Sequence, residues 1–109
     1  MEMLKEMSME ELEKQAMKEI AEEYGLELID ENDDVLIGFI TPQSLLQAIK
    51  RQKGVVVYNR YKANCMSGLK AYRYLHKVMD NEVEDCLCTI EDEGEFTIND
   101  GNKEIIIEF

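Results

Sequence analysis

The chain has 109 residues, of which 45% are hydrophobic and 33% charged, and its formal net charge is −12. This length predicts one domain over residues 1–109, with a frayed stretch at 1–7, and the composition excludes collagen-like and low-complexity proteins. Apolar runs fall short of the ~20 residues of a membrane span, and the acidic N-terminal residues are unlike a signal peptide. We therefore expect a cytoplasmic protein without membrane contact.

The charge is unevenly distributed along the chain. Residues 1–49 and 80–109 each carry a net charge of −10, whereas residues 50–79 hold eight bases and no acid. Four of the five tyrosines lie in the same basic segment. Such a segment either pairs with the acids of its own protein or is free to bind an external anion, and the sequence leaves both readings open.

A helix is predicted first, from a capping box at Ser8 and Glu11 to a terminating Gly25, with apolar residues at helical spacing. Two short apolar runs, 26–29 and 35–40, surround the polar segment 30–34 and predict a β-hairpin. Thr41 and Pro42 suit the start of a second helix, which we expect to end at Gly54.

The β-branched run at 55–58 predicts a central strand buried on both faces. A third helix is expected over about 62–79, where Lys62, Lys70, Arg73 and Lys77 fall within an arc of about 80°. Cys65 falls on its opposite, apolar side.

The C-terminal third predicts strands. Cys86, Cys88 and Ile90 alternate on one face, a second strand begins at 95–98, and an Asp-Gly turn within 99–102 leads into a closing strand. The order αββαβαβββ predicts an α+β fold with three helices packed on a mixed, mostly antiparallel sheet that ends in a C-terminal β-hairpin.

No catalytic constellation emerges, so we expect a non-enzymatic protein without cofactor or metal. The segment 30–34 opens like a calcium loop, but Val35 stands at the sixth position, where Gly is needed, and Thr41 at the twelfth, where Glu is needed. The cysteines lack the spacing of zinc knuckles or of a disulfide framework, and we interpret them as buried packing thiols in a reducing compartment. The single histidine, His76, is interpreted as a capping or packing residue.

Three functional hypotheses remain. In the first, acidic turns compete with nucleic acid for the basic cleft of a protein partner, because fixed carboxylates can imitate the ion pairing of phosphates. In charge and size, though in no motif, the chain resembles small acidic inhibitors encoded by viruses and mobile elements, such as anti-CRISPR proteins. In the second, the basic segment 50–79 binds nucleic acid directly. In the third, a small regulatory subunit self-associates, basic face to acidic face.

Each surface has its candidate residues. The acidic turns that would bind a protein partner comprise Asp30, Glu31, Asp33, Asp34, Glu84, Asp85, Glu91, Asp92, Glu93 and Glu95. The alternative basic face comprises Lys62, Lys70, Arg73 and Lys77 with Tyr58, Tyr61 and Tyr74.

Overall fold

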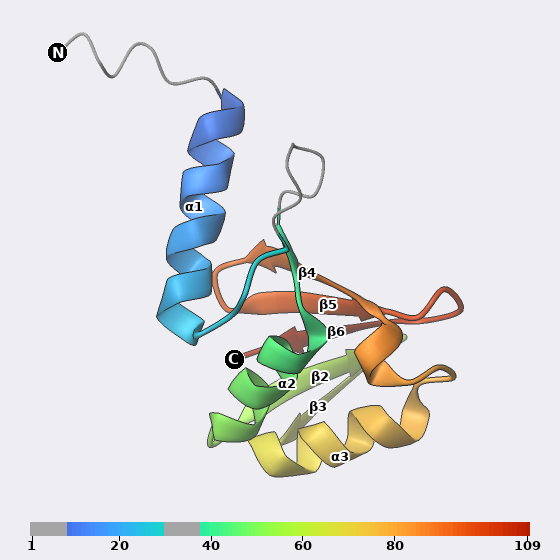
Figure 1. The fold of residues 1–109 in the computed structure, drawn as a ribbon. Coiled ribbons are helices and arrows are strands. Elements are labelled where there is room, and N and C mark those ends of the chain that lie inside the picture. The colour runs from blue at the N-terminus through green and yellow to red at the C-terminus, as the bar shows by residue number, and fades with distance from the viewer. Residues whose placement is uncertain (1–8, 30–37) are drawn as a thin grey trace, which may run out of the picture.

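The computed structural model describes residues 9–29 and 38–109, apart from the side chain of Glu10. There the chain forms three α-helices, a short 3-10 helix and one six-stranded sheet (Figure 1). The elements are α1 (Met9–Tyr24), β1 (Phe39–Ile40), α2 (Pro42–Arg51), β2 (Val55–Asn59), β3 (Lys62–Met66), α3 (Gly68–Val78), the 3-10 helix η2 (Val83–Asp85), β4 (Leu87–Asp92), β5 (Glu95–Asn99) and β6 (Glu104–Glu108). The predicted α+β class with three helices is confirmed. Within the described ranges no helix is long and apolar enough to cross a membrane.

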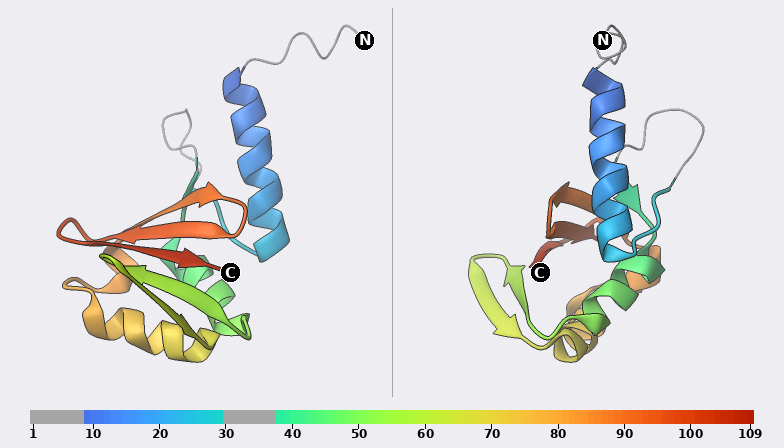
Figure 2. Two further views of the ribbon diagram at one scale, coloured as in Figure 1. Left: turned by 180° about the vertical axis from the view of Figure 1, so that it is seen from behind. Right: turned by 90° about the vertical axis from the view of Figure 1, so that its left-hand side faces the viewer.

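The sheet has the strand order β1-β4-β5-β6-β2-β3. Every neighbouring pair is antiparallel, so the expectation of a mixed sheet is wrong, while the predicted C-terminal hairpin is the pair β5–β6. One face of the sheet carries the core, in which Val57, Phe96, Ile98, Ile105 and Ile107 are fully buried. The helices α2 and α3 cover this face (Figures 1 and 2). Residues that alternate with the core residues along the strands point to the opposite face, which we call the open face.

Helices α2 and α3 both begin at side-chain caps. The Thr41 hydroxyl accepts a hydrogen bond from the Ser44 backbone N–H, as predicted, but α2 ends at Arg51 rather than at Gly54. In α3 the first residue is Gly68, and a Cβ there would lie 2.0 Å from the backbone oxygen of Ile49 in α2. The missing side chain therefore allows the two helices to approach closely.

Helix α1 is anchored by its C-terminal turns. The Tyr24 ring packs edge-on against Phe96 and Phe109, at centroid distances of 5.6 and 5.4 Å. Gly25 follows with a φ of +72°, the left-handed conformation that ends many helices, as predicted. The helix then projects past the sheet (Figure 2), so Met9 and Leu12 of the expected apolar stripe are exposed. The predicted cap residue Ser8 lies outside the described residues.

The third helix is shorter than expected. Residues 62–66 form β3, which pairs with β2, and α3 begins at Gly68 after the N-cap Ser67. Lys62 and Cys65 therefore belong to an edge strand and not to a helix. The exposed strand lacks the apolar alternation that usually reveals one.

Strand β2 is not buried on both faces. Val55 and Val57 are buried, whereas Val56 and Tyr58 on the open face are half-buried, because none of the described helices covers that side of the sheet. The first predicted hairpin is visible where the structure describes it: Leu28 pairs with Ile40 in an isolated bridge. Its turn, 30–34, and residues 35–37 lie outside the described residues.

Candidate interaction surfaces

Six carboxylates gather where β4 turns into β5. Glu91, Asp92, Glu93 and Glu95 were predicted from the sequence, and the fold adds Glu23 from α1 and Glu108 from β6. We call these six residues the acidic surface.

Three adjacent strands contribute to the acidic surface at one level of the sheet. Glu95 is the direct cross-strand partner of Glu108 in β6 and of Asp92 in β4. Neighbouring strands lie about 4.8 Å apart, so acidic residues follow one another across the sheet at a spacing of the same order as the charges along a nucleic-acid strand, about 3.4 Å per strand. Like charges placed directly opposite each other destabilise a sheet.

Hydrogen bonds from hydroxyl groups hold two of these carboxylates in place. The Glu91 carboxylate accepts bonds from the hydroxyls of Thr89 (3.0 Å) and Thr97 (3.3 Å). The Tyr58 hydroxyl donates to the Glu108 carboxylate at 3.1 Å, and this bond is the main cause of the raised pKa of Tyr58. The two carboxylates are therefore oriented before any ligand arrives.

Glu23 and Glu93 bring two acidic groups together from different elements. A hydrogen bond to Glu93, with smaller effects from burial and from the Glu93 charge, raises the pKa of Glu23. Glu23 therefore keeps its proton to a higher pH than an isolated glutamate does. Within the part of the chain that the structure describes, no Lys or Arg lies within 4 Å of a carboxylate of the acidic surface.

The remaining predicted acids do not join this surface. Glu84 and Asp85 lie in η2, before the other end of β4, and a strand of that length spans about 17 Å. Glu84 lies 3.6 Å from His76, whose Nδ1 is 3.0 Å from the Tyr72 carbonyl oxygen. His76 is exposed, and its ring nitrogens lie near groups of α3 and η2. Asp30, Glu31, Asp33 and Asp34 fall outside the described residues.

The bases of the segment 50–79 are exposed and form no ion pair with the acids that the structure describes. All eight of its bases are exposed, and none lies within 4 Å of an acid of the described ranges. These bases are Lys50, Arg51, Lys53, Arg60, Lys62, Lys70, Arg73 and Lys77. The protein therefore presents two oppositely charged surfaces.

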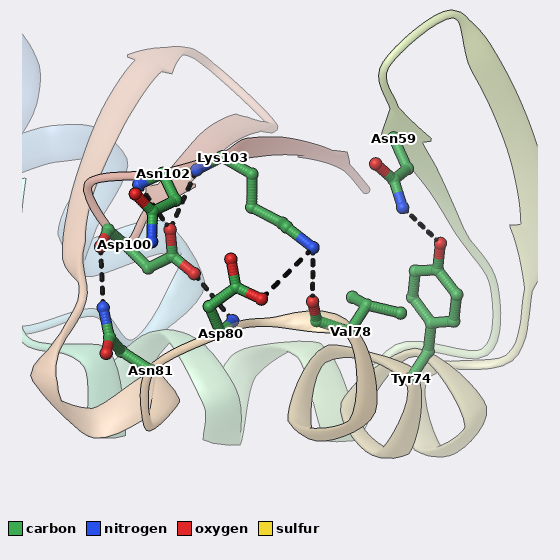
Figure 3. A network of polar contacts seen from close by, with 8 residues as sticks. All are labelled: Asn59, Tyr74, Val78, Asp80, Asn81, Asp100, Asn102 and Lys103. Carbon is green, nitrogen blue, oxygen red and sulfur yellow. Dashed lines mark hydrogen bonds and ion pairs between the residues drawn. The ribbon is translucent and has the colours of Figure 1, made fainter.

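The three tyrosines of the predicted basic face have different places. Tyr61 is fully exposed at the turn between β2 and β3. The Tyr74 hydroxyl accepts a 2.7 Å bond from the side-chain amide of Asn59, which ties the β2–β3 hairpin to α3 (Figure 3). Tyr58 instead hydrogen-bonds within the acidic surface, so the structure separates it from the bases.

The two buried cysteines are poor candidates for a reactive site. Cys86 and Cys88 are buried, and burial raises both pKa values, that of Cys88 to about 12, so both thiols stay protonated near neutral pH. Cys65 is exposed on β3, which contradicts its expected burial. The described residues contain no group of three or more His, Cys, Asp or Glu side chains that could hold a metal ion.

Sequence reasoning missed Glu23 and Glu108 as members of the acidic surface. Glu108 was detectable in part, because Ile105, Ile107 and Phe109 alternate with it and place it on the opposite face of the strand. Comparisons with protein-family models, with curated proteins and with solved structures find no match for this chain.

Proposed function

We propose that this protein is a non-enzymatic inhibitor or modulator that binds a nucleic-acid-binding protein through the acidic surface. The supporting observation is the direct opposition of Glu95 and Glu108, flanked by the Glu23–Glu93 pair, with no described base close enough to neutralise either. Like charges that are placed together at a cost in stability, with no described base to neutralise them, are typical of a functional site.

The chemistry of the proposed contact follows from this arrangement. A basic cleft that binds nucleic acid gains affinity from ion pairs and from the release of counterions. Carboxylates oriented by Thr89, Thr97 and Tyr58 offer the same ion pairs with little ordering cost, because the hydroxyls already restrain two of them. Binding of this kind is steered by charge and weakens as salt is added.

A capture experiment tests the proposal. The full chain is immobilised and exposed to a nuclease-treated lysate of its source or host, at low and then moderate salt. We expect retention of a protein that Glu91→Lys, Asp92→Lys and Glu93→Lys together abolish.

A matched variant controls for the change in net charge. Glu13→Lys, Glu19→Lys and Glu104→Lys also reverse three exposed acids, but these lie outside the acidic surface. If the control variant loses the captured protein as completely as the test variant does, and the two variants have the same melting temperature, the proposed site is contradicted.

Direct nucleic-acid binding through the basic segment is a second candidate, favoured by the exposure of all eight bases, none of which forms an ion pair with a described acid. Nucleic acid recovered from an untreated lysate, and lost with Arg73→Glu and Lys77→Glu, would favour it.

Self-association of the acidic surface with the basic face of another copy predicts a mass that rises with concentration at low salt.

A further inference from the structure

The turn of the β2–β3 hairpin holds a second unusual site. Asn59 pairs with Lys62, which leaves Arg60 and Tyr61 as a two-residue turn. Arg60 has a φ of +62°, a conformation that Gly, Asn or Asp adopts more readily. A long basic side chain is thus kept where glycine would fit with less strain, and backbone strain of this kind is common at binding sites.

The turn is anchored but its aromatic ring is free. Tyr61 is 101% exposed, so its ring contributes no packing to the fold. The Asn59–Tyr74 hydrogen bond, 2.7 Å long, fixes the base of the hairpin against α3 (Figure 3). An exposed ring on an anchored turn is a stacking platform that does not need to be ordered on binding.

A hollow of about 640 Å³ adjoins this turn, a size within the usual range of ligand sites. Its lining comprises Asn59, Arg60, Tyr61, Lys62, Val78 and Lys103. Lys103 is already engaged, because its ammonium donates to the Val78 carbonyl oxygen at 2.8 Å and lies 3.7 Å from Asp80 (Figure 3). The cations free to meet a ligand here are therefore Arg60 and Lys62.

Helix α3 extends this basic region. At 100° per residue, Lys70 and Lys77 lie about 40° and 60° to one side of Tyr74, whose hydroxyl contacts the hairpin. Both lysines are exposed and without an ion pair to the described acids. Four cations thus lie on the hairpin that carries Tyr61 and on the helix bonded to that hairpin: Arg60, Lys62, Lys70 and Lys77.

The negative charge of the whole protein does not prevent anion binding here. Register places the β2–β3 turn and the acidic surface at opposite ends of the strands, because Asn59 pairs with Ile105 whereas Val56 pairs with Glu108. Three residues of strand separate these two levels, a distance of about 10 Å, which is slightly longer than the Debye length of about 8 Å at physiological salt. Of the nearer acids, Asp80 lies 3.7 Å from the Lys103 ammonium. Glu104 stands beside Ile105 in β6 and alternates with that buried residue, so it points to the open face, away from α3.

We propose that the Arg60–Lys62 turn, together with Lys70 and Lys77, binds single-stranded nucleic acid, with one base stacked on Tyr61 and the cations on neighbouring phosphates. An unstacked base offers the ring a free face, which a base inside a duplex does not. This site rests on the second candidate function and specifies its residues and its ligand, and it needs no protein partner.

Fluorescence anisotropy with the purified full chain tests this site. The probes are fluorescein-labelled 15-nucleotide oligo-dT and oligo-rU, and a 15-base-pair duplex, each at salt concentrations from 50 to 200 mM. We expect both single strands to bind more tightly than the duplex, with a salt slope of about −3 for four phosphate contacts. Binding of the duplex as tightly as the single strands, or no binding at 50 mM salt, overturns the proposal.

Variants assign the binding to the turn. Tyr61→Ala should lower affinity about tenfold while Tyr61→Phe retains it, because stacking needs the ring and not the hydroxyl. Lys70→Glu with Lys77→Glu should reduce the salt slope by about 1.4, whereas Lys14→Glu with Lys18→Glu on α1 should leave it unchanged. Equal affinity of Tyr61→Ala and the parent protein overturns the stacking site, and this result is independent of protein capture by the acidic surface.

Discussion

Replacement of Glu95 by Gln should stabilise the fold. Glu95 lies directly opposite Glu108 in the β5–β6 ladder, so the substitution removes one of two opposed charges and keeps the size of the side chain. The Tyr58–Glu108 hydrogen bond is untouched, because Tyr58 bonds to the other carboxylate of the pair.

The size of the effect follows from the geometry. Opposed side chains in an antiparallel pair have Cβ atoms about 5 Å apart, which places the two carboxylates at about 6 Å. Two unit charges at that distance in water repel by about 0.7 kcal/mol. We therefore expect the free energy of unfolding to rise by about 0.5 kcal/mol and the melting temperature by about 2–4 °C at low salt.

Thermal and urea unfolding at 20 mM and 1 M salt measure this effect. The gain should fade at 1 M, where the Debye length is about 3 Å. Glu104→Gln is the matched control, because Glu104 lies opposite Asn99 rather than another acid and should change little. If Glu95→Gln is no more stable than Glu104→Gln at low salt, the opposed carboxylates cost nothing and the argument from strain fails.

Three other substitutions test the fold and its pH dependence. Gly68→Ala should destabilise the protein by about 2–3 kcal/mol in urea unfolding, because the new Cβ would lie 2.0 Å from the Ile49 backbone oxygen. Backbone N–H groups of Lys103, Asn102 and Asp80 lower the pKa of Asp100 from 3.8 to about 2, so its carboxylate stabilises the fold above pH 4 and this contribution is lost as pH falls through 2. The stability difference between the parent protein and Asp100→Asn should shrink over that window, and a constant difference would contradict the assignment. The raised pKa of Glu23 means that ionisation destabilises the fold, so Glu23→Gln should raise the melting temperature at pH 7, with the gain vanishing below the ordinary value of 4.5.

Local signals predicted the elements whose residues are unambiguous. Thr41 and Pro42 start a helix, Gly25 ends one, and alternation at Cys86, Cys88 and Ile90 marks buried residues at and before β4, all as observed. These features depend on neighbours in the chain, so sequence alone contains them.

Strand β3 was missed for a physical reason. Its residues are exposed, and the turn before it has Arg60 at positive φ instead of a glycine or asparagine that would reveal a hairpin. In the sequence, the bases of β3 and α3 therefore fall at helical spacing and resemble one face of a single helix.

The acidic surface depends on the register of the β5–β6 pair, which could not be predicted from the sequence pattern. A two-residue turn at Asp100 and Gly101 would pair Asn99 with Asn102. The structure instead pairs Asn99 with Glu104, because Asp100 closes a longer loop with hydrogen bonds to the backbone of Asn102 and Lys103. Only this register places Glu95 opposite Glu108.

Competition by nucleic acid is the most direct test of the account. The affinity of the captured protein partner for this chain is measured at rising concentrations of the nucleic acid that the partner binds. If the acidic surface occupies the nucleic-acid cleft, the apparent Kd should rise in proportion to the competitor, as two ligands of one site require. An unchanged Kd, with all three components in one complex, would show that the carboxylates bind elsewhere and would contradict the proposed mimicry.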